Sequence, residues 1–178
     1  WETIQLTSPK EGGSTEVREE TVDGWLFHRT PPVRGLVTDL PGFGEVELMG
    51  ELAHRIETLV RRYHPHVLHV HSPVLNALPA LRVGRRTGVP VLYEMRGLWE
   101  DAAVDHGTTR EGSLRYRISR ALETYAARRA HHVVTICEGL RDELVARGLS
   151  ADRISVVPNG VDVERFATTE AHDAELEV

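Results

Sequence analysis

Short apolar segments alternate with amphipathic helical segments over most of the chain, and this alternation restricts the fold more than any other feature. Four segments rich in Val, Leu and Ile are expected to be strands, at residues 67–71, 89–95, 133–137 and 154–158. Segments with the i, i+4, i+7 spacing of a helix separate them. Because the strands are apolar on both faces, the pattern predicts an α/β fold, a Rossmann-like parallel sheet flanked by helices on both sides.

The remaining segments complete this expectation. Helices are predicted at 48–63, from an N-cap at Ser72-Pro73 to Gly88, at 113–130 and at 139–148. In the helix 113–130 the apolar stripe that should face the core is Leu114, Ile118, Leu122 and Tyr125. Two short strands are expected near the N-terminus, at 1–9 and 24–30. Residues 10–24 and 97–112 are predicted to be loops, and residues 8–23 to be poorly ordered.

Composition excludes several classes of protein. A net charge of −6 and a pI near 5.9 argue against binding nucleic acid by bulk electrostatics. The single cysteine, Cys137, excludes an internal disulfide and is expected to be a small buried residue in a reducing compartment. No apolar run approaches the ~20 residues of a membrane span. The chain starts at Trp1 without Met or a signal peptide, so we expect residues to precede it.

Polar residues gather where the predicted strands end. His71-Ser72 follows the first strand, Glu94 and Arg96 the second, Cys137-Glu138 the third, and Asn159-Gly160 the fourth. Ligands of open parallel sheets bind beyond the carboxyl ends of the strands. The sequence therefore predicts a site at this edge.

Histidines crowd the segment 64–71, which raises the question of a metal. His69 and His71 share one face of a strand, about 7 Å apart along it. A third ligand could come only from Asp105 or His106, in a loop of unknown position, because His131 and His132 begin their strand and lie at the opposite edge. The expectation is therefore that no metal binds. His69 is expected to be satisfied under a helix, and His71 to be functional because it ends its strand.

Three stretches resemble one known family: VLHVHSPVLNALPALRVGRRTGVPVLYEMRGLWED (67–101), RALETYAARRAHHVVTICEGLRDELVARGL (120–149) and ISVVPNGVDVERF (154–166). They resemble the N-terminal domain of the retaining glycosyltransferases of family 4, which have the GT-B fold. The resemblance runs from about Trp1 to Phe166, and PNGVDVERF is its most specific piece. The stretch RGLWEDAAVDHG resembles bacterial enzymes associated with exopolysaccharide and exosortase gene clusters.

The resemblance implies one half of a two-domain enzyme. Residues 1–166 would bind a glycan or lipid-linked acceptor, and residues 167–178 would lead to a second domain that binds a nucleotide sugar. Transfer would retain the anomeric configuration without a metal or other cofactor. The residues implied at the site are His71 and Arg96 as catalytic residues, with Ser72, Glu94, Trp99, Glu138 and Asn159 binding the acceptor.

Two departures from the family pattern matter. Many members carry a histidine where this chain has Arg96, which cannot act as a base but can clamp a phosphate or carboxylate bidentately. The family's first strand with its Gly-rich loop, and its donor domain, find no counterpart in residues 1–178. The expectation is that these residues alone lack transferase activity and bind nucleotide sugars weakly at best. If the residues before Trp1 are absent, a self-associated or domain-swapped arrangement is expected to fill the exposed sheet edge.

Other functions stay open at this stage. A nucleotide-sugar epimerase or a hydrolase could use a similar double-Rossmann scaffold, and a non-catalytic binding domain is a third reading. The arginines of the helix 113–130 favour a solvated face, or else peripheral contact with an anionic membrane. The expected location is the cytoplasm, with contact to the inner membrane face.

Overall fold

The fold is described here from a computed structural model, which defines residues 2–8, 18–32 and 43–166. Strands are β1 (Gln5–Leu6), β2 (Arg18–Val22), β3 (Trp25–Arg29), β4 (Leu68–His71), β5 (Val91–Met95), β6 (His132–Thr135) and β7 (Ile154–Val156). Helices are α1 (Phe43–Tyr63), α2 (Val74–Thr87), α3 (Trp99–Asp105), α4 (Leu114–Arg129), α5 (Glu138–Ala146) and α6 (Val163–Phe166), with a 3₁₀ turn at Ala151–Arg153.

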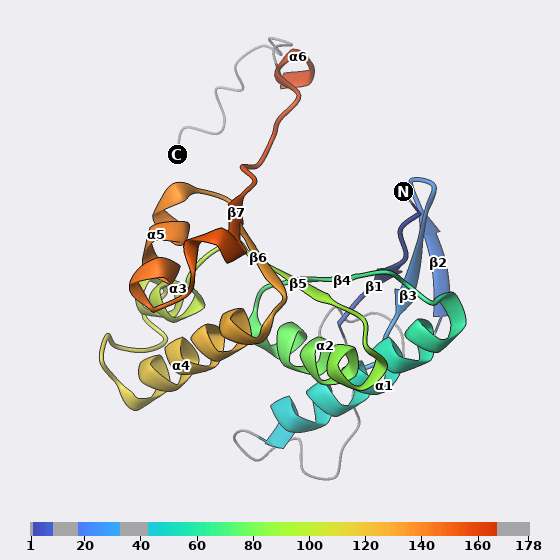
Figure 1. Cartoon of the computed structure of the whole chain (residues 1–178), viewed down its shortest axis with the longest axis horizontal. Helices are drawn as coiled ribbons and strands as arrows, with labels where there is room; N and C mark the ends of the chain where they lie inside the picture. The colour runs from blue at the N-terminus through green and yellow to red at the C-terminus, as the bar shows by residue number, and fades with distance from the viewer. Residues whose placement is uncertain (1, 9–17, 33–42, 167–178) are drawn as a thin grey trace, which may run out of the picture.

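The central sheet has the predicted parallel arrangement. Its strand order is β4-β5-β6-β7, and every neighbouring pair is parallel (Figure 1). The register places His71 beside Glu94. The carboxyl ends of all four strands therefore meet at one edge, as the sequence predicts for an α/β fold with flanking helices.

The two faces of this sheet differ in burial. On one face Tyr93, Met95, Val133 and Ile154 are buried against residues of α2, α4 and α5. The alternate positions, such as His69, are exposed or half-buried among the described residues. The expectation of strands apolar on both faces is wrong, because His69, His71, Glu94 and His132 interrupt the apolar residues of the second face.

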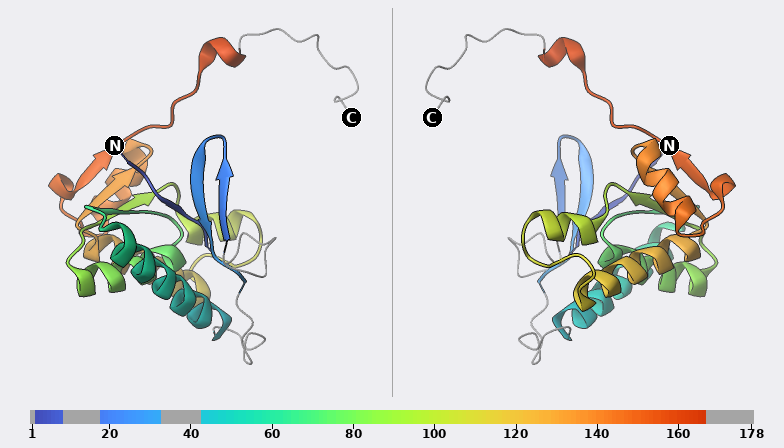
Figure 2. Two further views of the ribbon diagram at one scale, coloured as in Figure 1. Left: turned by 90° about the vertical axis from the view of Figure 1, so that its right-hand side faces the viewer. Right: turned by 90° about the vertical axis from the view of Figure 1, so that its left-hand side faces the viewer.

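A second, smaller sheet contains β1, β3 and β2 in that order (Figure 2). β2 and β3 form a hairpin whose turn residues Asp23 and Gly24 both have positive φ, 51° and 82°. Asp-Gly is a strong hairpin signal, so the prediction of a loop over residues 10–24 is wrong for β2. The part of that loop at 9–17 lies outside the described residues, as does the segment 167–178 assigned to a linker.

Two helices begin differently from the prediction. α2 ends at Gly88 in the left-handed conformation (φ 76°), as predicted, but it starts at Val74, with Pro73 instead of Ser72 at the N-cap position. α3 occupies residues that the sequence assigns to a loop. Pro79 is accommodated within α2.

The apolar stripe of α4 points the other way from the prediction. Leu114, Ile118, Leu122 and Tyr125 are 73%, 49%, 38% and 49% exposed. The helix packs through alanines and Glu123 instead. Cys137, expected to be buried, is also exposed. No helix in the described part of the chain is both long and apolar enough to cross a bilayer.

Candidate active site at the carboxyl edge of the sheet

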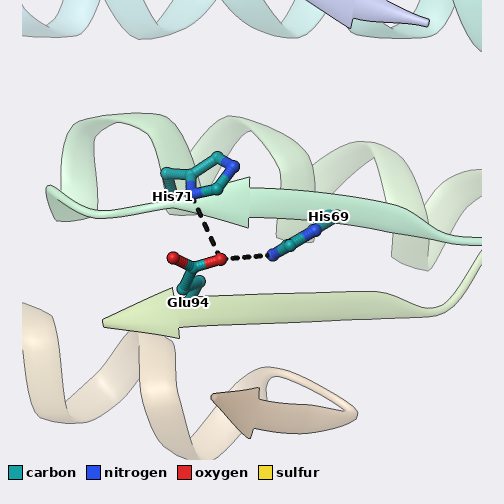
Figure 3. Close-up of side chains that lie close together, drawn as sticks. All are labelled: His69, His71 and Glu94. Atoms are coloured by element: carbon teal, nitrogen blue, oxygen red, sulfur yellow. Dashed lines mark hydrogen bonds and ion pairs between the residues drawn. The ribbon is translucent and has the colours of Figure 1, made fainter. Parts of the chain in front are cut away.

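Glu94 is the centre of a cluster of ionisable side chains at the carboxyl edge of the central sheet (Figure 3). This group, called the charge cluster below, contains His69, His71, Glu94 and Arg96. Its Oε2 lies 2.9 Å from Nε2 of His69 and 3.3 Å from Nδ1 of His71. Its Oε1 lies 3.8 Å from Nε of Arg96. One carboxylate thus faces two imidazoles with one oxygen and a guanidinium with the other.

The strand geometry explains how these side chains meet. His69 and His71 alternate onto one face of β4, and the parallel register brings Glu94 of β5 onto the same face beside His71. Glu94 is 17% exposed, while His69 and His71 are 44% and 55% exposed. The carboxylate is therefore the recessed member, and the two rings are accessible to solvent.

Ser72 fixes the backbone where β4 leaves the sheet. Its N–H donates to the carbonyl of Glu94 at 2.9 Å, and its Oγ accepts from the N–H of Arg96 at 3.3 Å. Asn76 of α2 donates from Nδ2 to the carbonyl of His71. These bonds join the ends of β4 and β5, so His71, Ser72, Glu94 and Arg96 form one connected group.

Three other residues named from the sequence lie outside this group. Trp99 begins α3 with an exposed ring, three residues after Arg96. Glu138 begins α5, is largely exposed and pairs with Arg141 at 3.2 Å. Asn159 lies exposed between β7 and α6. They follow the same strand ends as predicted, but within the described part of the chain none of the three forms a hydrogen bond or ion pair with Glu94.

Two expectations about the histidines are wrong. His69 is not sheltered under a helix in the described structure, since it is exposed and contacts Glu94. A third potential metal ligand does reach this edge: Glu94, whose oxygen lies with the His69 and His71 nitrogens within 4.8 Å of one another. The signal was present in the sequence, because parallel neighbours that end at the same edge bring His71 and Glu94 side by side.

A buried network lies behind the cluster on the packed face of the sheet. Tyr93 donates its hydroxyl to Glu123 Oε2 at 2.5 Å, and the N–H of Val74 donates to Oε1 at 2.9 Å. Burial raises the pKa of the Glu123 carboxyl above its usual value, while the two hydrogen bonds oppose that rise. Burial and the charge of Glu123 raise the pKa of Tyr93. These groups position α2 and β5, and their buried atoms do not face the cluster.

The charge cluster lies on an open surface. A shallow hollow of about 530 Å³ lies along α4, and a second, of about 170 Å³, lies between α1 and α2. The larger one is lined by Arg117, Arg120, Ala121, Thr124, Tyr125, Arg128 and Arg147. Neither is lined by the residues around Glu94. The two hollows therefore lie away from the charge cluster.

Solved structures share the fold at low sequence identity. A lipopolysaccharide outer core galactosyltransferase, WaaB, in its apo form matches with a TM-score of 0.51 and 15% identity, covering 79% of this chain and 32% of that one. A UDP-GlcNAc 2-epimerase from Neisseria meningitidis bound to UDP-GlcNAc gives 0.47 and 14%, covering 66% and 29%. A UDP-GlcNAc 2-epimerase from Methanocaldococcus jannaschii gives 0.45 and 19%, covering 63% and 28%.

The chain spans about a third of the length of these structures. At 15% identity, the likeness to the galactosyltransferase supports the fold alone. No curated protein matches the sequence. A family model, described as the glycosyl transferase 4-like domain, matches residues 2–160. That range includes the sheet and the charge cluster, and the chain belongs to the glycosyl transferase 4-like domain family.

Proposed function

We propose that this domain is the acceptor-binding half of a retaining glycosyltransferase. It would transfer a sugar from a nucleotide-sugar donor to a glycan or lipid-linked acceptor, in the bacterial cytoplasm. The observation that carries the proposal is the charge cluster around Glu94 at the carboxyl edge of a parallel sheet, in a domain of this family. Side chains at that edge are positioned to meet a ligand.

His71 and Arg96 are proposed to lie against the reacting groups. Arg96 is half exposed and only loosely held by Glu94 at 3.8 Å, so its guanidinium is free to bind a phosphate bidentately. Such a contact stabilises negative charge on a leaving diphosphate. His71 can hydrogen-bond an acceptor hydroxyl or phosphate through its second ring nitrogen.

The acceptor would extend from the cluster along the same edge. Ser72 and Glu94 offer polar contacts next to His71, and Glu138 and Asn159 offer them at the further strand ends. The exposed ring of Trp99 can lie against the C–H face of a sugar. The donor would be bound by a separate domain, since the chain covers about a third of its structural neighbours. The transfer step as proposed needs no cofactor.

Helix α4 favours an acceptor presented at a membrane. Its exposed stripe is Leu114, Ile118, Leu122 and Tyr125, and its one acidic residue, Glu123, is 1% exposed. Of the five arginines of α4, Arg120 pairs with Glu143 of α5 at 2.9 Å, and the other four add positive charge to the helix. An exposed apolar stripe on a basic helix is complementary to an anionic bilayer. We propose that α4 rests on the inner membrane face, which would suit a lipid-linked acceptor.

The test uses the protein together with its donor domain and a panel of nucleotide diphosphate sugars. We expect one sugar to be transferred or slowly hydrolysed, and Arg96→Ala to lower kcat by roughly 10²–10³-fold, as loss of one charge-stabilising donor does. The matched control is Arg82→Ala, an arginine on α2. Epimerisation of the sugar without transfer would support the epimerase instead, and binding without turnover would support a non-catalytic domain.

A companion titration tests residues 1–178 alone. With the donor site placed in another domain, we expect calorimetry to show only weak binding of any nucleotide sugar. Micromolar affinity of these residues by themselves would show that the donor site lies in this domain.

A further inference from the structure

We propose that His69, His71 and Glu94 form a binding site for a divalent transition metal of the zinc class. Each contributes one ligand atom: an imidazole nitrogen from each histidine and an oxygen from the glutamate. These three atoms lie within 4.8 Å of one another (Figure 3). The proposal concerns binding of the ion and stands independently of the transferase.

The backbone holds the three ligands in place before any ion arrives. Two of them come from alternate positions of β4, and the third comes from β5 in direct register with His71. Ser72 joins the ends of both strands through the carbonyl of Glu94 and the N–H of Arg96. A ligand set on paired strands therefore has little backbone freedom to lose when an ion binds.

The distances suit a metal of this size. Zinc bonds of about 2.0–2.2 Å to nitrogen and oxygen, at angles of roughly 90–110°, separate neighbouring ligand atoms by about 3.0–3.5 Å. The observed separations from Glu94 Oε2 are 2.9 Å to His69 Nε2 and 3.3 Å to His71 Nδ1. The two histidine nitrogens lie within 4.8 Å of each other, so an ion between the three atoms would require the exposed rings to rotate towards it.

The guanidinium of Arg96, which lies beside Glu94, does not occupy the proposed metal site. Arg96 approaches the other carboxylate oxygen, Oε1, at 3.8 Å, so Oε2 remains directed at the two histidines. The guanidinium is therefore closest to the carboxylate oxygen that does not face the histidines. Many metal-binding side chains are held in orientation by a group that does not itself bind the metal, and Arg96 would hold Glu94 in this way.

The donor set selects the class of ion. Two imidazoles with one carboxylate suit zinc and neighbouring transition metals, whereas magnesium and calcium take oxygen ligands. Three protein ligands leave at least one position open. Because His69 and His71 are 44% and 55% exposed, that position opens to solvent on the uncovered face of the sheet, where a water, hydroxyl or phosphate oxygen can enter.

The experiment measures zinc on the purified protein after removal of all metals. We expect one zinc ion per chain by equilibrium dialysis and elemental analysis. His69→Ala, His71→Ala and Glu94→Gln should each weaken binding at least about 100-fold, since losing a group that merely supports a ligand already costs roughly 10–100-fold. Circular dichroism without metal establishes that each variant is folded.

His66→Ala is the matched control, because His66 is an exposed histidine just before the same strand. It should bind zinc as the parent does. Equal weakening in this control would mean adventitious binding to surface histidines and would overturn the proposal. Tight zinc binding retained by both His69→Ala and His71→Ala would also overturn the proposal. As a further test, cobalt(II) is added to the parent protein, and the absence of absorption bands typical of a nitrogen-ligated ion would overturn it too.

Discussion

Glu123 accepts the N–H of Val74 at 2.9 Å, and so caps helix α2 from a position 49 residues further along the chain. Ser72 and Pro73 provide no side-chain cap at this end of α2. The positive end of the helix is therefore neutralised from within the core. The amide of Val74 is therefore not available to a ligand at the carboxyl edge of the sheet.

Replacing Glu123 should test this cap. Glu123→Ala leaves the Val74 N–H and the Tyr93 hydroxyl without their acceptor in a buried site. Each such group costs about 1–3 kcal/mol, so the free energy of unfolding should fall by at least about 2 kcal/mol. Glu123→Gln keeps an oxygen for Val74 and gives Tyr93 a donor, and should cost less. Urea unfolding measures the stability of both variants. An equal loss of free energy of unfolding in Glu123→Ala and Glu123→Gln would contradict the capping role.

Comparison of the parent protein with Glu123→Gln should also reveal a pH dependence of stability. Because burial raises the Glu123 pKa above the usual 4.5, the folded state binds its proton more tightly than the unfolded state. The contribution of this group to stability is full below pH 4.5 and is lost as pH rises through the folded-state pKa. The parent protein should therefore lose stability relative to Glu123→Gln across that window. If the free energy of unfolding of the parent minus that of Glu123→Gln stays constant or rises with pH, the assignment is contradicted.

Glu100 and Arg147 provide a second prediction about stability. Their charged groups lie 2.7 Å apart, with side chains 0% and 3% exposed, and they tie α3 to the end of α5. Although this distance is short, the atoms do not meet hydrogen-bond geometry, so the contact is an ion pair only. Glu100→Ala should lower the free energy of unfolding, but by less than the about 3–5 kcal/mol of a wholly unpaired buried charge, because Arg147 keeps its ion pair with Glu143 at 2.9 Å.

A double variant measures the interaction between Glu100 and Arg147 apart from the other contacts that each residue makes. Glu100→Leu with Arg147→Leu removes both charges, and the stability should return to within about 1–2 kcal/mol of the parent. Thermal and urea unfolding of the two single variants and the double variant complete the cycle. If the losses of the single variants simply add in the double variant, the two residues do not act as a pair.

The central sheet could be predicted from the sequence because its signals are local. Runs of Val, Leu and Ile end at Gly or Pro, and Gly88 ends α2 as expected. Convergence of His71, Glu94 and Arg96 followed from strand ends alone. The contact of His69 with Glu94 could not be seen in this way, because it depends on the register between two strands, which is not local.

Helices α3 and α4 show where local signals fail. α3 is short and acidic and is held by tertiary contacts, the Glu100–Arg147 pair and a hydrogen bond from Tyr116 to Asp101 at 2.8 Å. In α4 the periodicity located an apolar stripe but could not say which face packs. Close approach of Ala126 and Ala127 to the core selects the small-residue face, and leaves the large residues outside.

The exposed stripe of α4 leads to a prediction about membranes. The protein should sediment with vesicles that contain phosphatidylglycerol, and bind far less to neutral phosphatidylcholine vesicles. Binding should weaken as salt rises, because arginines near a charged surface contribute about 1 kcal/mol each before screening. Ile118→Glu should abolish it. Val46→Glu, at an apolar position on α1 that is 61% exposed against 49% for Ile118, is the control and should bind normally.

The outer edge of β4 gives the last prediction. Among the described residues, β4 pairs with β5 alone, and β1 pairs with β3 alone, so the two sheets stay separate. The N–H groups of Leu68 and Ser72 donate to the β5 side, which leaves the N–H of His69 directed to the free edge.

A free edge of this kind pairs readily with another strand. We therefore expect residues 1–178 to self-associate, with a concentration-dependent mass in sedimentation equilibrium. His69→Pro removes an edge-facing N–H and should shift the protein towards monomer while it stays folded. Val70→Pro removes an N–H that faces β5 and should unfold the sheet instead. A parent chain that stays monomeric at all concentrations would show that this edge recruits no second copy.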